Sequence, residues 1–391
     1  MEDKYNMARS SFSASSVRIK VVGLGGGGSN AVTRMVRDGV AGVEFIAMNT
    51  DAKSLAITEA PIRIQLGEKL VRGLGAGGDH HVGQKAAEEC RDEIREVVNG
   101  AEMVFVTAGM GGGTGTGSAS VVAEVAKQTG ALVIAVVTKP FGFEGTHRMA
   151  VAEDGIKMLM PLVDTLIIIP NDRLFTLCDQ KTGVDAAFRL ADEVLANGVQ
   201  AIAQVITVPG MINLDFADVR SIMKDAGPAW MSIGKGSGQN RAVDAAKAAL
   251  ASPLLDVSVT GAKGVLFNVT GGDNLSLFEV NEAAEIIKQA VNPDANIIFG
   301  VCRDSRMDKD LKITLIATGF ETTSMSGGNV NEAEISGYLK TLKGDNEEQL
   351  DVPAFLRRAQ FTQRHMPTPA PAPAPQKQQA PKAPSYNSWT R

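Results

Sequence analysis

The sequence predicts an α/β fold with a parallel, Rossmann-like sheet domain, a central helix and then a smaller domain. Short runs that are apolar almost throughout alternate with amphipathic segments from Val17 to about Phe320. A long segment with helical periodicity, 183–205, divides this region in two. Alternating strands and helices form right-handed βαβ units and therefore a parallel sheet. The length of 391 residues is sufficient for two domains.

The first half contains the predicted parallel sheet. Its strands are apolar along nearly their whole length, as expected of strands that are buried on both faces. Two amphipathic segments, 82–98 and 118–130, are predicted helices. In such sheets the functional groups lie in the loops after the carboxyl ends of the strands. The predicted strands are 18–25, 43–51, 103–110, 132–140 and 165–172.

The second half contains three further predicted strands, 263–272, 296–304 and 311–320. After them the apolar periodicity stops, and the Pro/Ala-rich end is expected to be extended and disordered. The predicted divisions are 1–16 (disordered extension), 17–183 (first domain), 184–204 (central helix), 205–320 (second domain), 321–349 (flexible acidic linker), 350–358 (short apolar island) and 359–391 (disordered basic tail).

Composition excludes several classes of protein. Hydrophobic residues make up 44% of the chain, which is enough for a buried core, and the net charge of −5 argues against nucleic-acid binding. Cys90, Cys178 and Cys302 are widely spaced and odd in number, as in proteins of a reducing compartment. The N-terminus is polar, and no segment has the roughly 18 apolar residues of a membrane span. We therefore expect a cytoplasmic protein that reaches a membrane only indirectly.

A glycine-rich loop, GLGGGGSNA at 23–31, follows the first predicted strand. Successive glycines let backbone N–H groups approach an anion, and the helix predicted to start near Ser29 adds its positive end. Gly23, Gly25 and Gly28 also fit the G-x-G-x-x-G pattern of dinucleotide-binding enzymes, with Asp51 placed to bind a ribose. By itself this loop is compatible with a dinucleotide enzyme, another nucleotide-binding protein or a tight strand–helix turn.

The second glycine-rich loop, GGGTGTG at 111–117, separates these possibilities. Its glycines form another bare backbone, and Thr114 and Thr116 add hydroxyl donors for phosphate oxygens. A dinucleotide fold needs one such loop, whereas two loops after two parallel strands suit a triphosphate held from both sides. The G-x-x-x-x-G-K-[ST] pattern of P-loop proteins does not occur. A flexible linker is disfavoured because an apolar strand and a helix bracket the loop closely.

GGGTGTG resembles the signature of the tubulin/FtsZ family, and GLGGGGSNA, NTD at 49–51 and LGAGG at 74–78 resemble FtsZ sequences in the same order. The resemblance covers about 17–320 and the island 350–358. It implies a GTP-binding first domain, an α+β second domain that activates hydrolysis, and GTP or GDP carried with Mg²⁺ without a permanent metal site. The implied phosphate-binding residues are Gly26, Gly27, Gly28, Ser29, Asn30, Gly77, Gly78, Gly113, Thr114 and Gly115.

Phe188 and Asp192 are four residues apart on the predicted central helix and therefore share a face. A phenyl ring can stack on a purine, and a carboxylate can accept the N1–H and 2-amino hydrogens of guanine, which favours GTP over ATP. Alternatively, Phe188 belongs to the core and Asp192 is solvated. The resemblance supports the first interpretation and implies two further assignments. These are Glu144 and Arg148 for the sugar and phosphates, and Asn171 for the base.

Asp215 and Asp218 stand at the start of a predicted helix, where acids are also common as caps. The resemblance implies that Asn213, Asp215 and Asp218 instead face the γ-phosphate bound by the next copy of the chain. Two carboxylates can orient the attacking water and help to hold Mg²⁺. We therefore expect a head-to-tail homopolymer in which stacking completes the GTPase site. The hypothesis predicts that Asp215→Ala and Asp218→Ala variants bind GTP but hydrolyse it poorly.

The island LDVPAFLRR at 350–358 resembles the C-terminal FtsZ peptide that membrane tethers recognise. Its apolar residues are too few to fold alone but can fold on a partner's groove. We expect membrane-tethering and regulatory division proteins to bind there, which implies a location at the mid-cell division ring. His80 and His81 depart from the sequence that is usual in FtsZ at this turn. An exposed, solvated pair is the favoured interpretation.

Two other functions are considered. An NAD-dependent oxidoreductase would use the G-x-G-x-x-G pattern and Asp51, but it leaves GGGTGTG without a role. A structural filament protein that uses nucleotide only to hold its copies together would not need the Asp215 and Asp218 pair. Binding of GTP against NAD tests the first alternative, and phosphate release tests the second.

Overall fold

A computed structural model describes residues 17–177, 183–207, 215–254, 259–304 and 307–320. The expectations for the N-terminal extension 1–16, for Asn213 and for the linker, island and tail at 321–391 lie outside the described residues. In the part of the chain that the structure describes, no helix is both long enough and apolar enough to cross a membrane.

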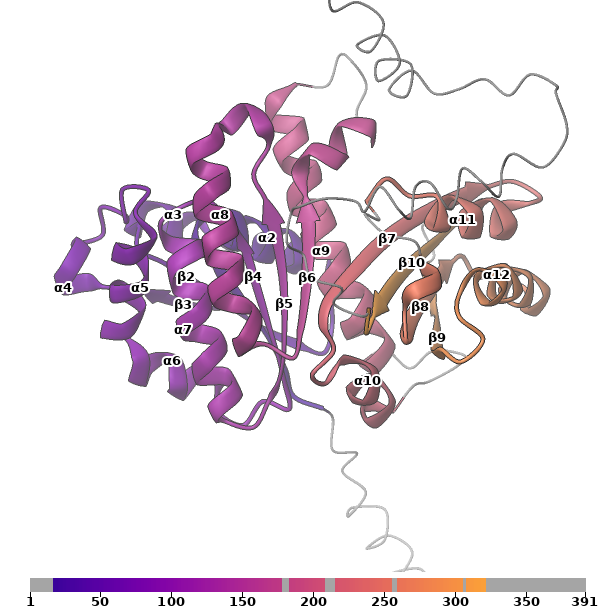
Figure 1. Cartoon of the computed structure of the whole chain (residues 1–391), viewed down its shortest axis with the longest axis horizontal. Coiled ribbons are helices and arrows are strands. Elements are labelled where there is room, and N and C mark those ends of the chain that lie inside the picture. The colour runs from indigo at the N-terminus through magenta and orange to yellow at the C-terminus, as the bar shows by residue number, and fades with distance from the viewer. Residues whose placement is uncertain (1–16, 178–182, 208–214, 255–258, 305–306, 321–391) are drawn as a thin grey trace, which may run out of the picture. The chain divides into compact units, whose positions relative to one another are not determined.

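The described strands form one ten-stranded sheet (Figure 1). Neighbouring strands are parallel from one edge as far as β7. Strand β10 is antiparallel to both of its neighbours, and β8 and β9 are parallel. In spatial order the strands are β3 (Ile62–Gln65), β2 (Val43–Asn49), β1 (Ile19–Leu24), β4 (Met103–Gly109), β5 (Leu132–Lys139), β6 (Thr165–Pro170), β7 (Gly227–Ser237), β10 (Asp310–Thr318), β8 (Gly264–Gly271) and β9 (Asn296–Arg303).

The strand β7 joins the two halves of the sheet. Its first residues, Gly227 to Ala229, pair with β6 in parallel, and the stretch from Trp230 to Ser237 pairs with β10 in antiparallel register. The sequence did not predict this strand, because its run of small residues and glycines lacks the continuous apolar character of the others. The parallel-dominated sheet and the smaller C-terminal domain are as predicted.

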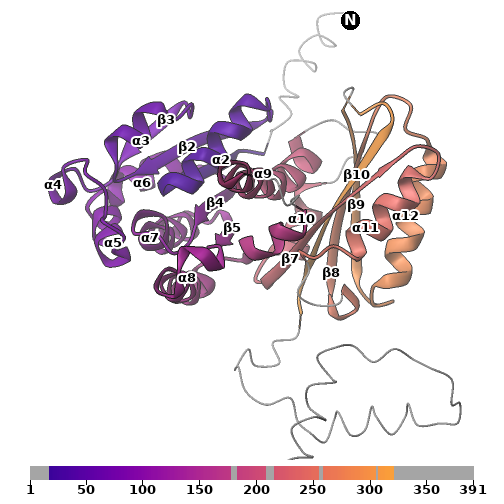
Figure 2. The same ribbon diagram turned by 90° about the horizontal axis from the view of Figure 1, so that it is seen from above.

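Helices cover both faces of the first half of the sheet. Figure 2 shows α2 and α9 on one face and α5, α7 and α8 on the other, while α11 and α12 pack on the second half. The helices are α2 (Gly25–Arg37), α3 (Ala52–Ile57), α4 (Glu68–Val71), α5 (His80–Glu89), α6 (Arg91–Val98), α7 (Thr114–Gln128), α8 (Thr146–Leu159), α9 (Val184–Thr207), α10 (Phe216–Met223), α11 (Arg241–Leu250) and α12 (Leu277–Ala290). Short 3₁₀ turns are η1 (Gly142–Glu144), η2 (Met160–Leu162), η3 (Asn171–Leu177) and η4 (Val259–Gly261).

The prediction of one continuous helix over 82–98 is wrong. Cys90, with φ −103° and ψ 17°, separates α5 from α6. Its thiol sulfur accepts a hydrogen bond from the Gly67 backbone N–H at 3.5 Å, so the break is tied to the chain before α4. The amphipathic pattern continues through the break and therefore does not reveal it.

Candidate functional site

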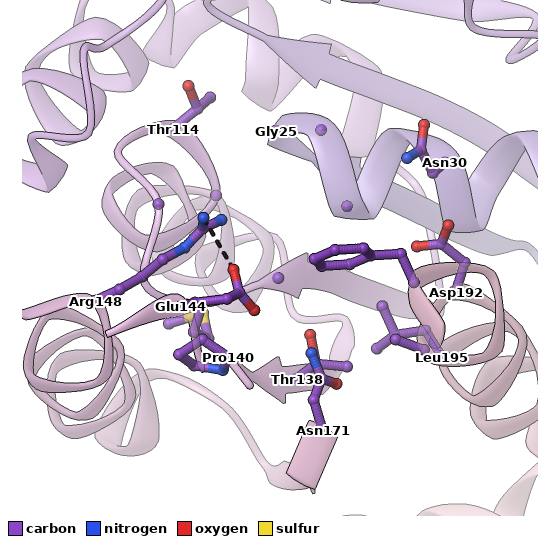
Figure 3. A pocket seen from close by; sticks show the side chains of 18 of the residues that line it. Gly25, Asn30, Thr114, Thr138, Pro140, Glu144, Arg148, Asn171, Asp192 and Leu195 are labelled. Carbon is purple, nitrogen blue, oxygen red and sulfur yellow. Dashed lines mark ion pairs between the residues drawn. The ribbon is translucent and has the colours of Figure 1, made fainter. Parts of the chain in front are cut away.

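A cavity of about 370 Å³ opens at the carboxyl ends of the parallel strands (Figure 3). The loops after β1, β4, β5 and β6 form one side of it, and α9 forms the other. Parallel sheets bind ligands at this edge. The structure brings most of the predicted nucleotide-binding residues to this cavity, namely Gly26, Gly27, Asn30, Gly113, Thr114, Gly115, Glu144, Arg148, Asn171, Phe188 and Asp192.

The first glycine-rich loop is itself the N-terminus of α2. The helix begins at Gly25, four residues before the predicted start near Ser29, and no side chain caps it. The first N–H groups of a helix have no partner within the helix. The backbone N–H groups of Gly26 and Gly27 therefore combine with the positive end of the helix dipole to form an anion-binding position at the cavity wall.

The glycines of this loop have different roles. A Cβ on Gly26 would meet no protein atom within 4 Å, so the bare backbone there leaves room for a ligand. A Cβ on Gly28 would instead collide with the Thr107 carbonyl oxygen of β4. Gly28 and Ser29, both predicted to bind phosphate, lie behind the cavity wall, and Ser29 is only 2% exposed. Gly28 allows α2 to pack closely on the sheet.

The second glycine-rich loop forms the N-terminus of α7, which begins at Thr114 and has no side-chain cap. Gly112 lines the cavity, and a Cβ on it would again meet nothing within 4 Å. The prediction that Thr116 donates to phosphate is wrong. The side chain of Thr116 is buried, and its hydroxyl oxygen accepts a hydrogen bond from the Gly111 N–H at 2.8 Å, which closes the loop on itself.

Gly77 and Gly78 lie in a second cavity, of about 850 Å³, and not in the first. The two cavities share Gly112, Gly113, Glu144 and Arg148 in their walls, so they adjoin. His80 and His81 line the second cavity with their rings 4.1 Å apart, and His81 is the more exposed of the two.

Glu144 and Arg148 form an ion pair of 2.9 Å at the boundary of the two cavities (Figure 3). The Glu144 carboxylate also accepts a hydrogen bond from the Phe141 N–H at 2.8 Å, which fixes it at the turn η1. The side chain of Glu144 is 8% exposed, whereas that of Arg148 is 50% exposed. The fixed carboxylate of Glu144 therefore suits a sugar hydroxyl, and the exposed guanidinium of Arg148 suits a phosphate.

The other end of the cavity contains two acceptors, a buried amide oxygen and a half-buried carboxylate. Asn171 is 5% exposed, and its Oδ1 atom has no hydrogen-bond partner in the described structure. Burial raises the pKa of Asp192 to about 7, and the nearby Arg34 guanidinium opposes this shift. Phe188 lies on the same face of α9 with its ring 5.5 Å from that of Phe141, edge to face. A buried acceptor without a partner, as at Asn171, suits a ligand that carries hydrogen-bond donors.

Asp51 is not available to bind a ribose. Its carboxylate caps α3, accepting hydrogen bonds from the Lys53 N–H at 2.9 Å and from the Ser54 hydroxyl at 2.7 Å. These bonds lower the pKa of Asp51, the Ser54 hydroxyl contributing most. The residue does not line the cavity. The ribose-binding role considered for a dinucleotide enzyme is therefore not supported.

Asp215 and Asp218 lie outside this cavity, at the N-terminus of α10. Asp215 occupies the N-cap position, but its side chain makes no capping hydrogen bond, and both residues are exposed. Among the residues that the structure describes, neither carboxylate has a hydrogen-bond or ion-pair partner. The capping alternative therefore does not account for Asp215. Asn213, predicted to act with them, falls outside the described ranges.

Several wall residues were missed, among them Thr138, Pro140 and Leu195. Thr138 and Pro140 stand at the carboxyl end of β5, so the rule that ligands bind at strand ends was the available signal. Leu195 lies on the face of α9 that carries Asp192, one turn further along. No group of three or more His, Cys, Asp or Glu residues that could hold a metal ion occurs within the described ranges.

Comparisons with known proteins agree with this geometry. Residues 18–179 match the model of the Tubulin/FtsZ family, GTPase domain, and residues 227–321 match that of the FtsZ family, C-terminal domain.

Among solved structures, an empty FtsZ dimer from M. jannaschii is 40% identical, with a TM-score of 0.78, over 84% of this chain and 98% of that one. A point mutant of M. jannaschii FtsZ is 43% identical, with a TM-score of 0.77, over 82% of this chain and 96% of that one. CetZ2 from Haloferax volcanii, solved as a GTPγS-bound protofilament, is 19% identical over 83% of this chain and 97% of that one. Its TM-score of 0.66 shows a shared fold.

Proposed function

The chain belongs to the Tubulin/FtsZ family of GTPases, and we propose that its copies stack head to tail and hydrolyse GTP at the contact between them. One observation carries this proposal. The cavity holds groups that suit a guanine nucleotide, whereas the exposed carboxylates of Asp215 and Asp218 belong to a different part of the surface. A second copy of the chain is the natural means of bringing the two together.

The base end of the cavity favours guanine. Asn171 offers a buried acceptor that has no donor in the described structure, and Asp192 offers a carboxylate whose pKa is raised by burial. Guanine supplies donors at N1 and at its 2-amino group. Adenine has no such pair of donors, so it would leave the half-buried carboxylate without a partner, at a cost of roughly tenfold or more in affinity. Phe188 is 39% exposed and available for stacking on the purine.

The phosphate end suits a triphosphate. The N-termini of α2 and α7 both lack side-chain caps and both open on the cavity, so two sets of free N–H groups converge there. The open space at Gly26 and Gly112 would admit phosphate oxygens against the backbone. Gly77 and Gly78, in the adjoining cavity, extend the same surface away from the base and toward the position of a γ-phosphate.

Hydrolysis requires positioning of water and control of charge rather than covalent participation of the protein. Asp215 and Asp218 of one copy would orient the attacking water at the γ-phosphate held by the next copy. Mg²⁺ bound with the phosphates would neutralise the charge that develops on them. The start of α10 fixes where Asp215 and Asp218 stand. Because their carboxylates have no partners among the described residues of their own chain, they remain available to a neighbouring copy.

Complementation between two defective variants tests this division of the site. Asn171→Ala/Asp192→Ala would keep the carboxylates of α10 but fail to hold GTP. Asp215→Ala/Asp218→Ala would hold GTP but lack those carboxylates. We expect each variant alone to release phosphate slowly and an equimolar mixture to recover a substantial part of the wild-type rate. A mixture no faster than its components would contradict a shared site.

The cellular role proposed for the filament is the cytokinetic ring at the bacterial division site, in the cytoplasm. The supporting findings are the matches to the Tubulin/FtsZ GTPase domain and to the FtsZ C-terminal domain, together with the similarity to FtsZ from M. jannaschii. Membrane-tethering and regulatory proteins would bind the island 350–358. A fluorescent fusion should form a mid-cell ring that disperses when 350–358 is deleted, and a uniformly distributed full-length fusion would contradict this role.

A further inference from the structure

Thr50 lies at the junction of three loops without lining the cavity itself. It follows β2 directly and is completely buried, at 0% exposure. The loop 72–78, which carries Gly77 and Gly78, lies on one side of it, and Thr114 of the second glycine-rich loop lies on the other. Thr50 is therefore placed between two of the loops that surround the phosphate end of the site.

The backbone on either side of Thr50 holds the loop 72–78. The Thr50 carbonyl oxygen accepts a hydrogen bond from the Gly75 N–H at 3.2 Å, and the Ala52 N–H donates to the Gly73 carbonyl oxygen at 3.1 Å. Asp51 and Leu74 form an isolated antiparallel bridge between these bonds. Three successive residues on each side, 50–52 and 73–75, are thus joined, and the loop cannot move without disturbing Thr50.

The side chain of Thr50 holds Thr114. The two hydroxyl oxygens are 2.5 Å apart, and either can be the donor. If Thr114 donates to Thr50, its oxygen presents only lone pairs to the cavity, and an anion is repelled. If Thr50 donates to Thr114, the Thr114 proton is free to point at the cavity and bind an anion. A phosphate group in the cavity selects the second arrangement.

We propose that Thr50 is a positioning residue that turns the Thr114 hydroxyl proton toward the nucleotide phosphates and links this contact to the loop 72–78. The inference rests on the proposed function, since it requires a phosphorylated nucleotide in the cavity. Under this proposal Thr50, which is buried and does not line the cavity, takes part in phosphate recognition. The loop with Gly77 and Gly78 is then linked to Thr114 through the backbone and the hydroxyl of Thr50, in addition to the close approach of Ala76 to Gly113.

The test compares Thr50→Val, which replaces the hydroxyl with a methyl group of similar size, with Thr50→Ser, which keeps it. We expect Thr50→Val to weaken GDP binding by about tenfold, as for the loss of a hydrogen bond to a charged group, and Thr50→Ser to bind within about twofold of wild type. Guanosine, which has no phosphate, should bind both variants as it binds the wild type. A thermal unfolding curve for each variant checks that the variant is folded.

A thermodynamic cycle with Thr114→Val separates positioning from a general structural effect. If Thr50 acts through Thr114, the double variant binds GDP no more weakly than Thr114→Val alone. Additive losses, or an equal loss of guanosine affinity, would overturn the inference. So would GDP binding by Thr50→Val at the wild-type level. Failure of the wild-type protein to bind GDP at all would instead contradict the proposed function, so the two failures are distinguishable.

Discussion

The carboxylate of Asp192 and the guanidinium of Arg34 interact across the packed helices α9 and α2, yet burial dominates and raises the pKa of Asp192 to about 7. Arg34 is already engaged by Asp38 at 3.7 Å and by Glu193 at 3.1 Å, so its charge is shared among several carboxylates. Below about pH 7 Asp192 therefore holds a proton in the nucleotide-free protein, and a guanine base, with two donors, would displace it.

Nucleotide affinity is accordingly expected to depend on pH. Guanine favours the ionised form of Asp192, so binding releases a proton wherever the empty site is protonated. The dissociation constant of GDP should fall as pH rises toward 7, by up to tenfold per unit, and level off above it. Titration calorimetry from pH 5.5 to 8 measures this. Asp192→Asn should bind more weakly and lose the pH dependence, whereas an unchanged slope in this variant would assign the proton to another group.

The same proton affects the stability of the protein without bound nucleotide. The pKa of Asp192 is higher in the folded chain than in the unfolded one, so its contribution to stability is complete at acid pH and lost as pH rises through about 7. Without nucleotide, Asp192→Asn should therefore unfold at a higher temperature than wild type at pH 8 and at a similar temperature at pH 4. A variant less stable than wild type at pH 8 would contradict this reasoning.

Methyl groups at the two open glycines should block nucleotide without harming the fold. Gly26→Ala and Gly112→Ala place a Cβ in space that no protein atom occupies, at positions without a positive φ. We expect GDP affinity to fall by at least about tenfold while the unfolding free energy changes by less than about 1 kcal/mol. Gly183→Ala is a matched control, because Gly183 has the same open surroundings and does not line the cavity. Equal affinities in all three variants would place the phosphates elsewhere.

Removal of either carboxylate of α10 should separate binding from hydrolysis. Asp215→Asn and Asp218→Asn are expected to lower the rate of phosphate release by on the order of 100-fold. Stability should change little, since the Asp215 side chain caps no N–H group. Asp244→Asn is the control, because Asp244 is also an exposed acid in the first turn of a helix, α11. Weakened GDP binding in the Asp215 and Asp218 variants would place these residues in the binding site of their own chain.

Arg241 and Glu279 hold α11 against α12. Their bonds, Nε to Oε1 at 2.6 Å and Nη2 to Oε2 at 3.1 Å, lower the pKa of Glu279 to about 2. The contribution to stability is complete above the unfolded pKa of about 4.5 and lost as pH falls toward 2. Glu279→Gln should cost about 2 kcal/mol of unfolding free energy at pH 7 and much less near pH 2.5, measured by urea unfolding. An equal loss at both pH values would indicate a packing defect instead.

Strong local signals made much of this architecture predictable. The apolar strands β1, β4, β5 and β6 are found almost where their runs of Val and Ile indicate, and both glycine-rich loops follow predicted strands. The resemblance to a family supplied Asn171, Glu144 and Arg148, which no spacing rule would select. Burial of Asp192 could not be predicted, because helical spacing allows it to be either solvated or enclosed.

The features that the sequence did not predict depend on tertiary structure. Strand β7 depends on neighbours on both sides, and glycines within it allow close packing of α11. A Cβ on Gly234 or Gly236 would collide with that helix. The helices α2 and α7 begin inside their glycine-rich loops because packing overrides the low helix propensity of glycine. Thr116 and Thr114 look alike in sequence, yet the turn at Gly111 buries one and exposes the other to the cavity.

The central claim is that one molecule holds the nucleotide and its neighbour supplies the groups that cleave it. The most direct test is the rate of phosphate release per molecule at saturating GTP, measured as the protein is diluted and with bound nucleotide monitored in parallel. The account predicts that the specific rate falls toward zero on dilution while GTP stays bound. A specific rate that remains constant down to isolated monomers would contradict it.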